Sequence, residues 1–147
     1  MLNEEELGQF LRGIEAFADV SDTAIAKLVD AFEERVCHPG EVVICQDALG
    51  KELCIVLEGE MLVTIAEKGE DETGQAVQTS RVGPTLKRGD IFGEIGVISG
   101  MESSATVCAS MEGCSILVMG GRKLHEQVLR NSPALASGLL RSMKRYL

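Results

Sequence analysis

The spacing of apolar residues changes twice along the chain, from a helical period to a strand period and back again. Two runs near the N-terminus repeat at intervals of three and four residues, which places each run on one face of a helix. The second run follows Ser21-Asp22, a typical helix start. The two runs are Leu7, Phe10, Leu11 and Ile14, and then Ile25, Leu28, Val29 and Phe32.

Short runs rich in β-branched and aliphatic residues fill the middle of the chain. The turn signal Pro39-Gly40 introduces them, because proline fixes φ and glycine tolerates positive φ. The runs cover residues 42–44, 53–57, 61–65, 105–109 and 114–119. Glu58-Gly59-Glu60 predicts a hairpin between the second run and the third. The polar stretch 67–80 is interpreted as a loop or an extended hairpin tip.

The helical period returns after Gly120-Gly121. A helix is predicted over residues 122–130, and Asn131-Ser132-Pro133 interrupts it, with Ser132 as N-cap and Pro133 as the first residue of the next helix. The last helix carries an apolar stripe of Ala136, Leu139, Leu140 and Met143, and a basic end of Arg141, Lys144 and Arg145. Short strands between terminal helices predict a mainly β barrel or jelly roll in a single domain. Its parts are N-terminal helices (1–34), a β-barrel (35–120) and C-terminal helices (121–147).

Charge and composition narrow the possible partners. The chain has 23 acidic and 14 basic residues and a net charge of −9, which disfavours nucleic acid and anionic lipid. No apolar run approaches the roughly 20 residues of a membrane span. The acidic N-terminus lacks the build of a signal peptide. We therefore expect a cytoplasmic protein with no nucleic-acid partner and no membrane insertion.

Cysteine and histidine usage gives no sign of a metal or catalytic centre. The five cysteines form no C-x-x-C pair, and their odd number in apolar stretches indicates reduced, mostly buried thiols. The two histidines, His38 and His125, stand far apart, so a jelly-roll metalloenzyme is disfavoured and no metal is expected. No Ser/His/Asp or Cys/His catalytic set is recognisable, and we expect that the chain is not an enzyme.

The stretch from Leu86 to Val107 carries the candidate chemistry. Gly93 lets the backbone turn into a short helix that starts near Glu94, and backbone N–H groups at a helix start can cradle an anion. Glu94 has two interpretations from its position alone. It either caps the helix electrostatically or accepts hydrogen bonds from a ligand hydroxyl.

Phe92-Gly93-Glu94, followed by Ala105-Thr106-Val107, resembles the phosphate-binding cassette of the cyclic nucleotide-binding domain family. Pro39-Gly40-Glu41 and Leu57-Glu58-Gly59-Glu60 look like that family's strand connections. The pattern is most similar to the regulatory domains of cGMP- or cAMP-dependent protein kinases. The resemblance implies an eight-stranded jelly-roll β-barrel flanked by N-terminal helices and two C-terminal helices, with a short helix in the cassette. It also implies cGMP or cAMP as an allosteric ligand.

The same resemblance implies roles for individual residues. Glu94 would hold the ribose 2′-OH, and backbone amides around Gly93, Glu94 and Ile95 would surround the phosphate. Tyr146 is a candidate cap that stacks on the purine. The ligand-binding residues expected on this basis are Phe92, Gly93, Glu94, Ile95, Gly96, Ser103, Ser104, Ala105, Thr106 and Tyr146.

This sequence departs from the family's Pro-Arg pair, because Glu102 and Ser103 stand in its place. A hydrogen bond to a charged group contributes about 1.5–3 kcal/mol, so loss of the arginine weakens phosphate binding on the order of ten- to more than a hundredfold. Ser104 follows the arginine position, where a hydroxyl favours guanine in the family, and this slightly favours cGMP over cAMP.

Three outcomes therefore stay open for the site. It binds cyclic nucleotide weakly, it recruits a basic residue such as Arg81, Lys87 or Arg88, or it serves only as structure. We expect a regulatory module that couples cyclic nucleotide to movement of its C-terminal helices and to a linked effector. The parent protein would be a cyclic-nucleotide-dependent serine/threonine kinase. The alternative is a degenerate, non-binding docking domain within such a kinase.

Overall fold

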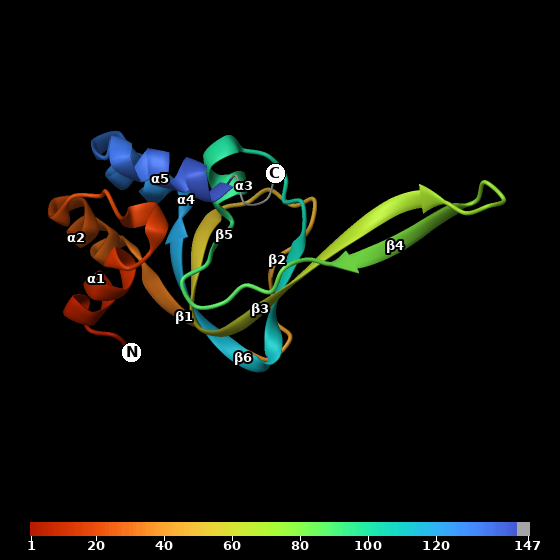
Figure 1. Cartoon of the computed structure of the whole chain (residues 1–147), viewed down its shortest axis with the longest axis horizontal. Coiled ribbons are helices and arrows are strands. Elements are labelled where there is room, and N and C mark those ends of the chain that lie inside the picture. The colour runs from red at the N-terminus through yellow and green to blue at the C-terminus, as the bar shows by residue number, and fades with distance from the viewer. Residues whose placement is uncertain (144–147) are drawn as a thin grey trace.

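The computed structural model describes residues 1–143, apart from the side chains of residues 95, 96, 127, 128, 131 and 143. An antiparallel sheet forms the middle of the molecule, and helices from both ends of the chain gather on one side of it (Figure 1). The helical segments are α1 (Glu4–Arg12), η1 (Glu15–Phe17), α2 (Asp22–Ala31), α3 (Glu94–Ser99), α4 (Gly121–Lys123), η2 (Leu124–Val128), η3 (Leu129–Asn131) and α5 (Pro133–Met143). The strands are β1 (Glu33–Cys37), β2 (Val42–Ile44), β3 (Glu52–Glu70), β4 (Ala76–Val82), β5 (Ile91–Phe92) and β6 (Thr106–Gly120).

The two N-terminal helices begin at side chains that cap them. In α1, the Asn3 side chain accepts from the Glu6 backbone N–H, and the Glu6 carboxylate accepts from the Asn3 backbone N–H. In α2, the Ser21 hydroxyl accepts from the Ala24 N–H, as the sequence predicts. These caps satisfy backbone donors that the helices themselves leave unpaired. Ile14 differs from its prediction, because it lies just beyond the end of α1.

Two helices were predicted in the C-terminal region. The second is confirmed, and the first differs from its prediction. At the start of α5, the Ser132 hydroxyl accepts from the Leu135 N–H at 3.3 Å. The continuous helix predicted over residues 122–130 is instead divided into α4, a π-helical η2 and a 3₁₀ η3. The Gly121 N–H donates to the Lys51 carbonyl at 2.8 Å, so the segment is tied to the sheet at its first residue. Lys144 and Arg145 lie outside the described residues.

The sheet contains six strands within residues 1–143, and the expected count of eight is wrong. Its order is β1-β6-β3-β4, with β2 paired to β6 and β5 paired to β3, so the sheet is not closed into a barrel. The hairpin predicted at Glu58-Gly59-Glu60 does not exist, because β3 runs through it. Gly59 has φ +80° and lies where the β3–β6 register shifts on both sides. Glycine therefore makes a bulge here, which bends a strand without ending it.

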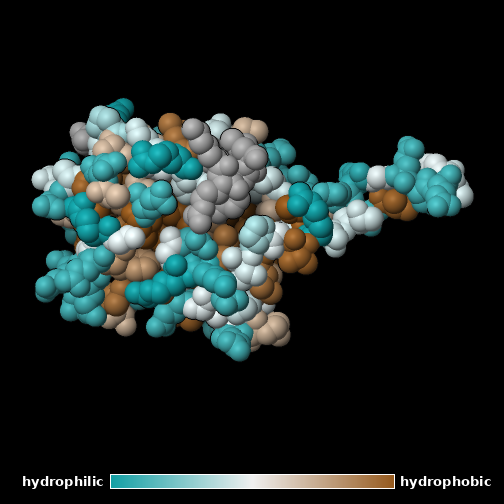
Figure 2. All heavy atoms as spheres, viewed as in Figure 1, coloured by the Kyte–Doolittle hydropathy of each residue, from teal (hydrophilic) through white to brown (hydrophobic). Residues whose placement is uncertain are grey.

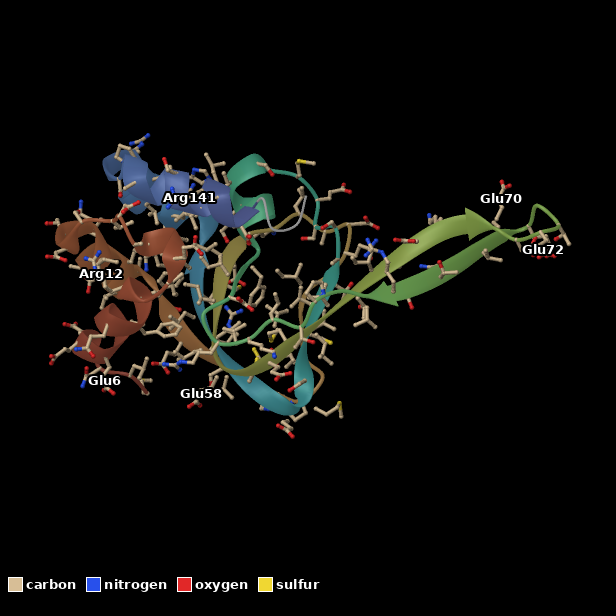
Figure 3. The ribbon with its side chains drawn as sticks, in the orientation of Figure 1. Glu6, Arg12, Glu58, Glu70, Glu72 and Arg141 are labelled. Carbon is tan, nitrogen blue, oxygen red and sulfur yellow. The ribbon has the colours of Figure 1, made fainter. Side chains whose placement is uncertain are left out.

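A glycine with positive φ also lies between the strands that were expected at 105–109 and 114–119. They form the single strand β6, in which Gly113 has φ +79°. The outer part of β3 and the whole of β4 form a two-stranded arm, residues 64–82, that projects from the body of the molecule (Figure 1). The polar stretch is thus an extended hairpin tip, with Glu70 and Glu72 at its far end (Figure 3). Hydrophilic side chains predominate at that tip, with a small hydrophobic group beside them (Figure 2).

Alternation along the long strands divides the interior into two cores. Leu53, Ile55 and Leu57 of β3 face the helices, whereas Cys54 and Val56 face the opposite side of the sheet. Strand β6 repeats this division, with Leu117 and Met119 in the helical core and Ile116 and Val118 in the other. Because a strand points successive side chains to opposite faces, a continuous apolar run here marks a strand buried on both sides.

The cysteines are all free thiols, and three of the five are buried. The buried thiols are Cys37, Cys54 and Cys114, and burial raises the pKa of Cys54 to about 12. No helix within residues 1–143 has both the length and the apolar character needed to cross a bilayer.

The packing of α5 on η1 depends on Gly138. A Cβ atom at this position would lie 1.7 Å from the Ala16 carbonyl oxygen. Alanine in a helix normally stabilises it by roughly 0.5–1 kcal/mol relative to glycine. We expect Gly138→Ala to do the reverse and lower the free energy of unfolding by about 1–3 kcal/mol, because α5 must move away from η1.

Gly8→Ala in α1 is the matched control, since its Cβ would meet the Val29 side chain at an ordinary 3.8 Å. Urea denaturation of both variants measures the difference. Equal or greater stability of Gly138→Ala would contradict the close approach of α5 to Ala16.

Candidate functional site

Strand β5 holds the start of the candidate site between the two cores. Ile91 lies in the helical core and Phe92 in the opposite core, and both are nearly fully buried. They pair with Ile55 and Cys54 of β3. We call residues 92–107 the cassette. Its first residue is therefore fixed by burial and by strand pairing together.

Gly93 turns the chain from β5 into α3. Its φ is +81°, and a Cβ atom there would lie 2.4 Å from the Glu52 carbonyl oxygen. A side chain at this position would meet both backbone strain and a collision with β3. The turn lets α3 begin at Glu94, as the sequence predicts.

The far end of the cassette is held by the loop that follows β2. The Ser103 N–H donates to the Ala48 carbonyl at 2.9 Å, and the Asp47 N–H donates to the Ser103 carbonyl at 2.8 Å. The Thr106 hydroxyl accepts from the Gln46 N–H at 3.0 Å. Both ends of the cassette are thus anchored, and the residues between them border a hollow.

This cassette hollow encloses about 80 Å³. Its walls are mainly apolar, with the Glu94 side chain and two serines as the polar contributions. The Glu94 residue is only 1% exposed. The lining residues are Ile44, Val63, Leu86, Phe92, Gly93, Glu94, Ser103, Ser104, Ala105 and Val107.

The structure brings most of the predicted site residues together. Those that line the hollow are Phe92, Gly93, Glu94, Ser103, Ser104 and Ala105. Thr106 lies next to them in β6, with its hydroxyl bonded to Gln46. Ile95 and Gly96 belong to α3, but their side chains are not described. Tyr146 lies outside the described residues, so its role as a cap stays a prediction.

Four wall residues were not among the predicted site residues. Ile44, Val63, Leu86 and Val107 come from different strands and loops, and sheet register brings them to one place. Val107 and Val63 are register partners, and Leu86 contacts the sheet by a bridge to Met61. Period-two alternation in the strands was the available signal, but register between strands is not visible in the sequence.

No lysine, arginine or histidine is among the described residues that line the cassette hollow. Two of the basic residues that the sequence offered as substitutes have other partners. Arg81 forms an ion pair with Glu67 on the arm. Arg88 donates to the Leu57 carbonyl at 2.7 Å and stacks 4.7 Å from the Phe10 ring centre. Lys87, the third, is exposed and does not line the hollow.

A larger hollow of about 380 Å³ lies elsewhere, between η1, the turn before β5, and α5. Both Arg88 and Arg141 line it, together with Glu15 and Asp90. Its charges are mixed and Arg88 is already bonded, so it offers no concentrated charge to a ligand. Across the described residues, no group of three or more His, Cys, Asp or Glu side chains is placed to hold a metal ion.

Val97 connects the cassette to the C-terminal segment. Its side chain is buried and lies against Gly121, where a Cβ atom would be 3.2 Å from Val97 Cγ1. The His125 Nε2–H donates to the Val97 carbonyl at 2.9 Å. Helix α3 also contacts α5. A displacement of α3 therefore acts directly on the helices that follow β6.

The cassette lies within a region that matches a known protein family. The sequence profile described as "Cyclic nucleotide-binding domain" matches residues 34–131. The chain belongs to the cyclic nucleotide-binding domain family. The match includes the whole cassette, and the resemblance of the chain to this family is confirmed.

Curated relatives of the chain include a kinase regulatory subunit and a kinase. The cAMP-dependent protein kinase regulatory subunit of Yarrowia lipolytica is 35% identical over 100 residues, which are 68% of this chain and 24% of the relative. A cGMP-dependent protein kinase of Drosophila melanogaster, isozyme 2, is 26% identical over 132 residues, or 89% of this chain. The chain spans only 13% of the length of that Drosophila relative.

Solved structures share the fold at lower identity. The regulatory domain of Toxoplasma gondii PKA, crystallised with cAMP, matches with a TM-score of 0.76 and 18% identity, over 97% of this chain and 50% of that one. The regulatory subunit of a cAMP-independent protein kinase A from Trypanosoma cruzi, bound to guanosine, matches with a TM-score of 0.68 and 23% identity. That match covers 90% of this chain and 43% of the other.

The contact at Gly93 can be tested by substitution. We expect Gly93→Ala to lower the free energy of unfolding by more than the roughly 1–2 kcal/mol that left-handed backbone strain alone costs. The reason is the added collision with the Glu52 carbonyl oxygen. Chemical denaturation followed by circular dichroism measures the change.

Gly100→Ala is the matched control, because Gly100 has φ +70° and, beyond its chain neighbours, no atom of the described residues lies within 4 Å of the position that a Cβ would occupy there. It carries the strain without the collision. Equal losses for the two variants would show that β3 does not constrain the start of the cassette.

Proposed function

We propose that the chain is a regulatory domain in which the cassette hollow senses a ribose-containing ligand and transmits its binding to the C-terminal helices. The observation that carries this proposal is Glu94, a residue that is 1% exposed and lines a mainly apolar hollow. A carboxylate in such a place can accept short, strong hydrogen bonds from ribose hydroxyls. The family's use of this glutamate on the ribose 2′-OH supports the assignment.

Cyclic nucleotides are the first ligands to consider, and we propose that they bind weakly. Backbone N–H groups in the first turn of α3 can contact a phosphate, but Ser103 replaces the arginine that neutralises it in the family. Ser104 lines the hollow, so we expect cGMP to bind somewhat better than cAMP. Because the Trypanosoma cruzi neighbour holds guanosine, nucleosides belong in the same set of ligands.

The size of the hollow supports coupling between binding and movement. Small-molecule sites generally enclose about 300–1,000 Å³, whereas this hollow encloses about 80 Å³. A nucleoside or nucleotide therefore needs α3 and the Ser103 linker to move apart. Through Val97, such a movement displaces Gly121 and His125, so the ligand biases a two-state arrangement of the C-terminal segment.

The effector of this movement is proposed from the relatives. Both curated relatives described above are kinase proteins, so we propose a linked or associated protein kinase as the partner and a regulatory, non-catalytic role for this domain. We further propose that residues 1–147 act as one unit, since helices from both ends share a core with the sheet.

A second candidate function is a docking domain that binds no ligand. The same small volume and the same Ser103 substitution favour it. The two functions differ in a measurable way, because a docking domain with a collapsed hollow does not respond to the return of an arginine.

We expect Ser103→Arg to raise affinity for cGMP and cAMP on the order of ten- to a hundredfold, since a charge-assisted hydrogen bond to phosphate is restored. Isothermal titration calorimetry measures the change. Gln78→Arg on the exposed arm is the control, because it alters net charge equally but lies away from the hollow. Absence of binding in both variants would favour the docking function.

Coupling through Val97 predicts a second effect. Ligand binding is expected to change amide hydrogen exchange across residues 121–131, and His125→Ala is expected to reduce that change severalfold because it removes the hydrogen bond to the Val97 carbonyl. His38→Ala, an exposed histidine just after the end of β1, is the control. An unchanged exchange response in His125→Ala would place the coupling elsewhere.

A further inference from the structure

We propose that the cassette hollow selects an uncharged ribonucleoside over the corresponding cyclic monophosphate. This inference rests on the proposed function, because it names the chemical class of ligand for the same site. It follows from the charges around the hollow and from its size.

The ionisable residue on the walls is acidic. Glu94 is the only ionisable residue among the described residues that line the hollow. A carboxylate attracts hydroxyl donors, which a ribose supplies as a vicinal pair, but it repels the phosphodiester of a cyclic nucleotide. Low exposure strengthens both effects, because little water screens the interaction.

The segment at Ser103, which also lines the hollow, adds no positive charge. Ser103 is neutral, and its backbone N–H and carbonyl are already bonded to the loop at Asp47 and Ala48. Its neighbour Glu102 is exposed and adds another carboxylate beside the hollow. Bringing Arg81 or Arg88 to a phosphate would break the Glu67 ion pair or the bond to the Leu57 carbonyl.

One lysine lies close enough to require its own test. A neighbouring hollow of about 260 Å³ shares Ile44 and Ser103 with the cassette hollow, and Lys51 lines it. Lys51 does not line the cassette hollow itself. If the ligand drew Lys51 past Ser103, this lysine would supply the missing positive charge, and the inference would be wrong.

The remaining walls suit the other half of a nucleoside. Ile44, Val63, Leu86, Phe92 and Val107 present apolar surface, which can pack against the faces of a purine. Removal of the cyclic phosphate also reduces the bulk that the closed hollow must admit. An uncharged nucleoside thus matches the apolar walls and the carboxylate, and it requires less opening of the hollow than a cyclic monophosphate does.

Calorimetric titration of the whole chain with guanosine, adenosine, cGMP and cAMP tests the inference. We expect each nucleoside to bind at least about tenfold more tightly than its cyclic monophosphate. The 2′-deoxynucleosides are expected to bind more weakly than the ribonucleosides, because a hydroxyl donor to Glu94 is lost. Ser103→Arg is expected to reverse the order, and Gln78→Arg is expected to leave it unchanged.

Two results would overturn the inference and leave the proposed function intact. One is equal or tighter binding of the cyclic monophosphates by the unaltered chain. The other is cyclic nucleotide binding that disappears in Lys51→Met while the melting temperature stays the same, since that would identify the counter-charge. Absence of binding by all four ligands would overturn the inference and the proposed function together.

Discussion

The close approach of Gly93 to the Glu52 carbonyl is the constraint on which the candidate site depends. It joins the first turn of the cassette to the edge of β3, at a distance that admits no side chain. Ile91 and Phe92 hold the preceding strand in two separate cores, so the chain has little freedom before the turn. The position of Glu94 is therefore set by packing in the sheet rather than by α3, which is too short to be stable alone.

The two-sided burial of β3 and β6 explains how a chain of 147 residues supports this arrangement. Each strand contributes alternate side chains to the helical core and to the core beneath the cassette. A movement of the helices therefore changes the packing on one face of these strands, and the opposite face of the same strands supports the hollow. Val97 adds a direct contact, because it touches Gly121 and its carbonyl accepts from His125.

Local signals in the sequence predicted the starts of α2 and α5 and the cassette turn, whereas the helix predicted over residues 122–130 is divided into three segments. Ser21, Ser132 and Gly93 each act at the position that their chemistry favours. The same kind of reasoning failed at Gly59, because a glycine with positive φ serves a bulge as readily as a turn. Only the partner strand decides between them, and that pairing is a long-range property. The runs expected at 53–57 and 61–65 are therefore one strand, and so are the runs expected at 105–109 and 114–119.

Prediction of the candidate site from the sequence is limited in the same way, because part of the site depends on strand pairing. Motif spacing identified Glu94 and the serine that replaces the family's arginine, because these lie within one continuous stretch. The walls formed by Ile44 and Val63 depend on strand register, and so does the separation of Lys51 from the hollow. Whether the substituted site is degenerate or specialised is therefore a question of geometry. Burial of a carboxylate carries a desolvation cost, which either the first turn of α3 or the hydroxyl of a ligand can offset. Glu94 remains almost fully buried beside mainly apolar walls, and this supports the proposal that the hollow holds the hydroxyls of a ribose.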